Sequence, residues 1–199
     1  MTAPRIWTQT VSGRAVELID PVAEMIDFDD IAHGLAHINR YSGQTLRPVS
    51  VAFHTLLGLT MADEALAPYW LLHDAHEAYT GDITTPMKQA LADLSFTSED
   101  SLRFIQSKLD IAIREASGLR PRNFITLKAL AAIKALDLRC LATERRDFLG
   151  PSPHPWGAVI EAAAPSPRVW RGDEFGATPA AVAATLRGAF QQFLPALRT

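Results

Sequence analysis

The stretch YWLLHDAHEAYTGD concentrates side chains that can bind a metal ion or transfer a proton. Five ionisable residues fall within ten positions, namely His73, Asp74, His76, Glu77 and Asp82. In a helix, Glu77 would share a face with His73 four positions earlier and with Asp74 three positions earlier. A cation held by His73 and Asp74 would therefore have the Glu77 carboxylate beside it. Alternatively, an exposed helix end could carry these acids in solvent without a cation.

A carboxylate on an apolar helix face is the second chemical signal. Asp137 shares one face of a long helical pattern with Leu130, Ile133, Cys140 and Leu141, so we expect its side chain to be buried. A buried carboxylate without a partner would cost several kcal/mol. Asp137 must then be protonated, paired with an arginine from elsewhere in the chain, or bound to a metal ion.

His54 is a further polar group in an apolar stripe, with Val51, Leu57 and Met61 as its helical neighbours. A single histidine in such a stripe is more often a hydrogen-bonded core residue than a metal ligand. A mixed set of imidazoles and carboxylates suits Mn, Fe, Co, Ni or Zn better than Ca. The sequence has no complete zincin motif, no cysteine cluster, no Walker phosphate loop and no Gly-x-Ser-x-Gly elbow.

At these residues the chain resembles the HD superfamily, whose namesake is an adjacent His-Asp pair. Within that superfamily it is similar to the bacterial 5'-deoxynucleotidases and to the phage dATP triphosphohydrolases. The resemblance runs from Ile38 to Glu144, and its elements follow the family's order: INRYSGQT, SVAFH, LLHDAHEAYTGDITTPMK and IKALDLRCL. It implies a mainly α fold, an HD-domain helical bundle, and a metal-dependent phosphohydrolase.

The resemblance also implies roles for individual residues. Glu77 would be the catalytic carboxylate, and Asp82 would orient the sugar or the attacking water. Arg40 and Lys88 would contact phosphate, although each could instead be a surface or helix-capping cation. Chemistry agrees, because a guanidinium matches phosphate oxygens and the helix beginning at Thr85 could present its N-terminus to an anion. The four metal ligands implied by the resemblance are His54, His73, Asp74 and Asp137.

Two departures from the family pattern concern the substrate. Tyr41 stands where the deoxynucleotidases carry a tryptophan associated with screening the sugar, so the resemblance does not imply selectivity against ribose. The pair Glu77-Ala78 replaces the Glu-Asp of guanosine tetraphosphate hydrolases, and the Gly-Tyr-Pro signature of the cyclic-dinucleotide enzymes is missing. Because the family residue at the position of Tyr41 is associated with the sugar, Tyr41 is expected to bind the substrate together with Arg40 and Lys88.

Three functions remain open from the sequence. The first is removal of the 5'-phosphate from (deoxy)nucleoside monophosphates with a divalent ion, which could be Mn, Co, Fe, Ni, Zn or Mg. The second uses the same ligands to release tripolyphosphate from a deoxynucleoside triphosphate. The third is a non-catalytic nucleotide or metal sensor, with the Pro-rich segment 151–167 as a surface for a partner.

The elements that would position these residues are mainly helical, in a single domain over 1–199. Residues 1–28 form an appendage, in which 5–20 are rich in strand formers and Ser12-Gly13 indicates the turn of a β-hairpin. Residues 150–176 form a Pro-rich loop, and 177–199 carry a C-terminal helix. The spacing of apolar residues predicts helices over 29–40, 49–62, 68–79, 98–117, 123–146 and 179–197, with another beginning at Thr85-Pro86.

Bulk properties exclude several classes of protein. The 199 residues carry 19 Lys and Arg against 22 Asp and Glu, a net charge of −3, so no basic footprint for a polynucleotide or an anionic membrane is present. The single cysteine excludes an internal disulfide, and the first ten residues do not have the pattern of a signal peptide. We expect a cytoplasmic protein with a small-molecule nucleotide substrate. An apolar face on the last helix is more typical of core, and association into a homodimer stays open.

Overall fold

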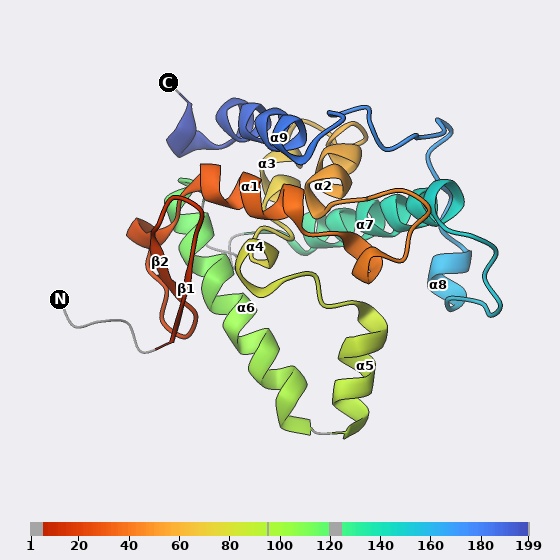
Figure 1. The fold of residues 1–199 in the computed structure, drawn as a ribbon, viewed down its shortest axis with the longest axis horizontal. Helices are drawn as coiled ribbons and strands as arrows, with labels where there is room; N and C mark the ends of the chain where they lie inside the picture. Colours follow the sequence, from red (N-terminus) through yellow and green to blue (C-terminus); the bar gives the residue numbers. More distant parts are fainter. Residues whose placement is uncertain (1–5, 95, 120–124, 199) are drawn as a thin grey trace.

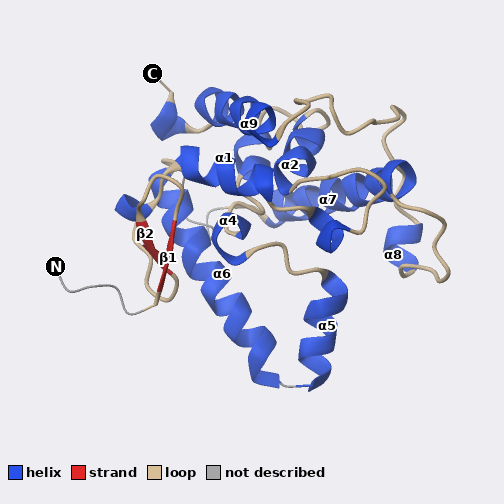
Figure 2. Cartoon of the chain, in the orientation of Figure 1, coloured by secondary structure: helices blue, strands red, loops and turns tan. Residues whose placement is uncertain are grey.

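The computed structural model describes residues 6–94, 96–119 and 125–198, and these form a mainly α fold with one small β-hairpin (Figures 1 and 2). This confirms the predicted fold class. Arg5 of the predicted hairpin and Asn123 of the predicted long helix lie outside the described residues. In the described part of the chain, no helix is both long and apolar enough to cross a membrane.

The hairpin pairs β1 (Trp7–Gln9) with β2 (Ala15–Glu17) in antiparallel register. Gly13 lies in the turn with a φ of +86°, a value that favours glycine. The backbone N–H of Ser12 donates to Asp30 Oδ1 (3.1 Å), and the Ser12 hydroxyl donates to Asp30 Oδ2 (2.6 Å). These two bonds tie the hairpin to the first helix of the bundle.

Two clusters of buried apolar side chains hold the helices together. The larger one lies between α1 (Phe28–His37), α9 (Pro179–Phe193) and the inner faces of their neighbours. The smaller one lies where α2 (Val51–Leu59) meets α3 (Ala67–Leu71) and α7 (Leu127–Phe148). Members of the two clusters include Ile31, Leu35, Leu109, Ile113, Leu186, Phe190, Phe53, Trp70, Cys140 and Phe148.

The predicted continuous helix over 68–79 is wrong. After α3 the chain makes successive tight turns, and α4 begins only at Glu77 and ends at Thr80. Here the backbone N–H groups of His73, Ala75 and Glu77 each donate to the carbonyl oxygen three residues earlier, and not four residues earlier as in an α-helix. The His73 side chain also donates to the Trp70 carbonyl oxygen (2.6 Å), which an α-helix would need for a backbone bond.

The remaining elements frame this centre. α5 (Thr85–Leu94) and α6 (Phe96–Ala116) form a helical hairpin that extends from the body of the molecule (Figure 1). Between α7 and α9 the Pro-rich loop is largely irregular and contains only the short α8 (Ala158–Glu161) in its described residues. The short 3-10 turns are η1 (Ala23–Met25), η2 (Arg40–Gly43) and η4 (Pro195–Leu197).

The apolar face of α9 is core within this one chain. Val182, Leu186, Ala189 and Phe190 are all buried, mostly against α1. The alternative, that this face forms an interface between two copies, is therefore not needed to explain its pattern. Association into a homodimer stays a prediction.

Candidate metal centre

Two separate segments bring three of the four expected metal ligands together, and a third segment places Asp137 beside His54. His54 comes from α2, His73 and Asp74 from the turns after α3, and Asp137 from α7. His54 Nε2 lies 3.2 Å from His73 Nε2, 3.7 Å from Asp74 Oδ2 and 3.7 Å from Asp137 Oδ1. His73 Nε2 lies 3.1 Å from Asp74 Oδ2. His54, His73 and Asp74 each offer one ligand atom, and these atoms all lie within 4.8 Å of one another.

Hydrogen bonds fix which nitrogen of each imidazole faces the others. Nδ1 of His54 lies 2.7 Å from Glu144 Oε1, and Nδ1 of His73 lies 2.6 Å from the Trp70 carbonyl oxygen. An ionised carboxylate and a carbonyl can only accept, so both Nδ1 atoms carry the hydrogen. In the neutral imidazoles each Nε2 then has a free lone pair, and the two lone pairs face each other.

This arrangement fits a divalent ion. The two lone pairs and the Asp74 carboxylate converge on one point, with the Asp137 carboxylate beside His54. Such groups repel one another unless a positive charge lies between them. Atoms bound about 2.1 Å from one ion lie roughly 3.0–3.4 Å apart, close to the separations found here. Burial lowers the pKa of His73, but the Asp74 carboxylate, together with Asp137 and the Trp70 carbonyl, outweighs burial and raises that pKa overall.

Asp137 is only half-buried, which corrects the expectation that it lies on a buried face. Its side chain is 27% exposed, and Oδ2 accepts a hydrogen bond from Lys134 Nζ (2.8 Å). The first turns of α7 are open to solvent, as the 85% exposure of Leu127 shows, so the buried face begins only at Leu136 and Cys140. Of the alternatives for Asp137, pairing with an arginine is not found among the described residues; the partner is a lysine one turn away. The link of Asp137 to the centre rests on its contact with His54.

Two further acids, Glu77 and Asp82, lie close enough to Asp74 to be affected by its carboxylate. Glu77 is only 5% exposed, and its Oε2 has no hydrogen-bond partner among the described residues. Burial, followed by the Asp74 and Asp82 carboxylates, raises its pKa to about 10. Burial likewise raises the pKa of Asp82. The ammonium of Lys88 on α5 is near enough to oppose both shifts, which places Lys88 at this end of the site.

Arg40 and Tyr41 belong to the centre rather than to the surface. The Arg40 guanidinium is buried, its Nε donates to Glu144 Oε2 (2.9 Å), and its Nη1 lies 3.9 Å from Asp74 Oδ2. The surface alternative for Arg40 is therefore wrong. The Tyr41 hydroxyl also donates to Glu144 Oε2 (2.6 Å). Tyr41 and Ser42 both have left-handed backbones, with φ of +56° and +51°.

Glu144 is the residue that sequence reasoning missed. It is fully buried on α7, and burial alone would raise its pKa, but Arg40 and then His54 lower it to about 2. Its spacing of seven from Asp137, with Cys140 between, places it on the same side of the helix. Two arginines follow Glu144 in the sequence, a charged run that is typical of a surface segment. His76, by contrast, turns toward α6, where its Nδ1 lies 3.0 Å from Asp110 Oδ1.

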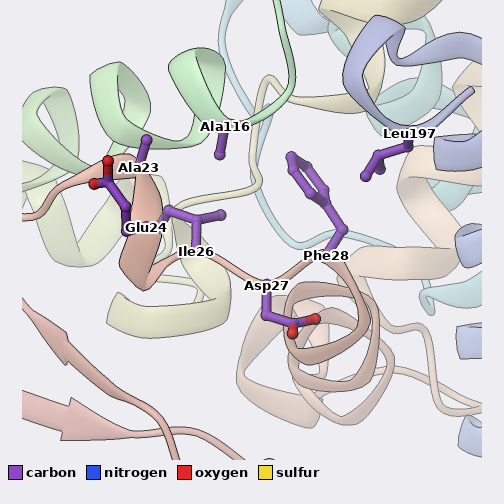
Figure 3. Close-up of a pocket in the computed structure, with 7 residues that line it drawn as sticks. All are labelled: Ala23, Glu24, Ile26, Asp27, Phe28, Ala116 and Leu197. Atoms are coloured by element: carbon purple, nitrogen blue, oxygen red, sulfur yellow. The ribbon is translucent and has the colours of Figure 1, made fainter.

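Two surface hollows lie apart from this centre. One, of about 400 Å³, is lined by residues at the start of α1 and by Ala116 and Leu197 (Figure 3). The other, of about 500 Å³, lies between the end of α7 and the Pro-rich loop. Neither is lined by any of the expected metal, catalytic or substrate residues. The residues expected to bind the metal, the substrate or the reacting water therefore lie at the candidate metal centre and not at these hollows.

Comparison with known proteins shows a family but no activity. The chain is 37% identical over 142 residues to the uncharacterized protein YfdR of Escherichia coli. This match spans 71% of the chain and 72% of YfdR. The chain belongs to the YfdR family. A second relative, an uncharacterized protein of Rhodobacter capsulatus, is 42% identical over 96 residues, and the match spans about half of that relative (49%) and 44% of this chain. No family model matches the chain.

Proposed function

We propose that this YfdR-family protein is a divalent-metal-dependent phosphohydrolase that removes the 5'-phosphate from nucleoside monophosphates. One observation carries the proposal: ligand atoms of His54, His73 and Asp74, from two separate segments, lie within 4.8 Å of one another. Asp137 lies beside His54, and the buried, unpartnered oxygen of Glu77 is nearby. The resemblance to the HD superfamily supplies the reaction class, since its ordered motifs contain the same residues.

The donor set supports a transition-metal ion. Two imidazole nitrogens and two carboxylates suit Mn, Fe, Co, Ni or Zn better than Ca. When bound, such an ion lowers the pKa of water and polarises a phosphoryl oxygen. Both Nδ1 atoms of His54 and His73 are held by acceptors, which is the usual way in which a protein orients histidine ligands.

The chain's own residues then have separate tasks. With a cation offsetting the neighbouring carboxylates that raise its pKa, Glu77 would be ionised and would accept a proton from the attacking water at Oε2. At the same time the water oxygen bonds to phosphorus and the bond from phosphorus to the 5'-oxygen breaks. The leaving 5'-oxygen takes up a proton from solvent, Glu77 later releases its proton to solvent, and the products are a nucleoside and inorganic phosphate. Asp82 orients the water or the sugar. Arg40 is held through its Nε, and its terminal amino groups and Lys88 bind the phosphate.

A product analysis tests this proposal. Protein reconstituted with Mn²⁺, Co²⁺, Ni²⁺, Zn²⁺ or Mg²⁺ is incubated with ribo- and deoxyribonucleoside mono- and triphosphates, and the products are identified by chromatography. We expect inorganic phosphate and nucleoside from monophosphates. Tripolyphosphate would instead assign the triphosphohydrolase activity. Nucleotide binding without any hydrolysis across the panel would overturn the proposal in favour of a sensor.

Glu77→Gln tests the assigned proton acceptor. We expect kcat to fall by about two or more orders of magnitude, which is the usual effect of losing a general base, while metal content is unchanged. Glu64→Gln is the matched control, because Glu64 is exposed in the turn between α2 and α3. Full activity in Glu77→Gln would remove Glu77 from the mechanism.

A further inference from the structure

Glu144 uses its two carboxylate oxygens for two different parts of the centre. Oε1 accepts from His54 Nδ1 (2.7 Å), and His54 is an expected metal ligand. Oε2 accepts from Arg40 Nε (2.9 Å) and from the Tyr41 hydroxyl (2.6 Å), and these are expected substrate residues. The side chains of Glu144 and His54 are both fully inaccessible to solvent.

From this division we infer that Glu144 is a positioning residue that orients the metal ligand His54 and the substrate residues Arg40 and Tyr41 at the same time. The inference rests on the proposed function, because it assumes that His54 binds a metal ion. In this role Glu144 itself contacts neither the metal nor the substrate. Its effect passes through His54 on one side and through Arg40 and Tyr41 on the other.

The chemistry of the three bonds requires a carboxylate at this position. Three donors point at Glu144, and an ionised carboxylate has only acceptors to offer them. A glutamine of nearly the same shape would turn an N–H₂ group toward at least one donor, so one of the three bonds must break. A carboxylate bound to Nδ1 also makes Nε2 of the same imidazole more basic and holds the ring in one orientation.

The backbone at Tyr41 and Ser42, before α2, has an unusual conformation that accompanies the bond from Tyr41 to Glu144. Tyr41 and Ser42 are consecutive non-glycine residues in the left-handed region, a conformation that side chains disfavour and that persists only where surrounding contacts hold it. The bond from the Tyr41 hydroxyl to Glu144 is such a contact. It follows that this hydroxyl is already committed, so Tyr41 would meet a substrate with its ring.

Zn²⁺ affinity, measured by competition with a chromophoric chelator, tests the inference without any activity assay. We expect Glu144→Gln to weaken Zn²⁺ binding by about 10- to 100-fold, the usual effect of removing a group that orients a ligand. Glu64→Gln should bind as wild type does. In a His54→Ala background, Glu144→Gln should have little further effect, because the coupling passes through His54. Equal Zn²⁺ affinity in Glu144→Gln and wild type would overturn the inference.

Wild-type protein gives a second test that does not depend on the folding of a buried variant. In Zn²⁺-loaded protein with ¹⁵N-labelled histidine, NMR should show His54 protonated at Nδ1, with a coupling network that places Nε2 at the metal. Protonation of His54 at Nε2 would overturn the inference. Wild-type protein that binds no Zn²⁺ would overturn it together with the proposed function. Tight, Glu144-dependent Zn²⁺ binding without hydrolysis would uphold the inference and refute the proposed function alone.

Discussion

Gly58 of α2 lies directly against the indole of Trp70, so Gly58→Ala tests how core packing supports the candidate metal centre. A Cβ atom at this position would lie 2.0 Å from Trp70 Cζ2 and 2.2 Å from Cε2. Trp70 is fully buried, and its Nε1 donates to the Thr55 carbonyl oxygen (2.7 Å). Its ring stacks on His73, with centroids 3.9 Å apart. The indole is rigid, so an added methyl group must displace the ring, α2 or His73.

The size of the overlap sets the expected loss of stability. Non-bonded carbon atoms make contact at about 3.5–4.0 Å, so the atoms at Gly58 and Trp70 would overlap by roughly 1.5–2 Å. Overpacking a core costs about 1–3 kcal/mol, and this overlap belongs at the upper end of that range. The better helix propensity of alanine returns up to about 1 kcal/mol. We expect a net loss of about 2 kcal/mol, or roughly 4–8 °C in Tm for a chain of this size.

Thermal unfolding followed by circular dichroism measures this loss, and Zn²⁺ titration measures its effect on His73. Gly188→Ala is the matched control, because Gly188 is also helical and an added Cβ meets no atom within 4 Å. That variant should be as stable as wild type or more stable by up to about 1 kcal/mol. A Gly58→Ala protein that melts like Gly188→Ala and binds Zn²⁺ normally would refute the packing argument.

Three other predictions concern stability. Burial raises the pKa of Asp30, but hydrogen bonds from Ser12 and Thr10 and the charge of Arg14 together outweigh burial and lower it overall. Asp30 therefore stabilises the fold above its unfolded pKa of about 4, and this contribution disappears as the pH falls through the folded pKa. Urea unfolding of Ser12→Ala should show a deficit of about 1–2 kcal/mol at pH 7 that shrinks near pH 3. Thr178→Ala removes the N-cap bond to Ala181 of α9 and should cost about 1 kcal/mol, whereas no change would mean that the cap is dispensable. Zn²⁺ at about 100 times its Kd should stabilise wild type by about 2.7 kcal/mol, and a chelator should reverse this.

Local patterns were sufficient to predict most elements of the fold. The Ser12-Gly13 turn marked the hairpin, and apolar spacing marked α1, α6, α7 and α9, because each of these signals comes from residues close together in the chain. The break after α3 was not predictable in this way. It depends on the hydrogen bond from the His73 imidazole to the Trp70 carbonyl oxygen, which the periodicity of apolar side chains does not predict.

The site was predictable only in part, for the same reason. The His73–Asp74 cluster is local and was recognised from spacing, whereas the convergence of His54 and Asp137 with it came from the family resemblance. The burial expected of Asp137 was wrong, since nothing local shows that the start of α7 is uncovered. Glu144 is buried by His54, Arg40 and Tyr41, which are about 90–104 positions away in the chain.

The charges at this centre explain why its parts depend on one another. Arg40 and the ammonium of Lys88 are the described cations that act on the buried acids, while Lys134 touches only the outer oxygen of Asp137. Arg40 pairs with Glu144, and the same guanidinium also offsets part of the repulsion among Asp74, Glu77 and Asp82. An added cation would lessen that repulsion further. Because metal ligands must be deprotonated, protons and a metal ion would compete for these acids. The same cluster that weakens the metal-free fold is thus what would give a divalent ion its binding energy.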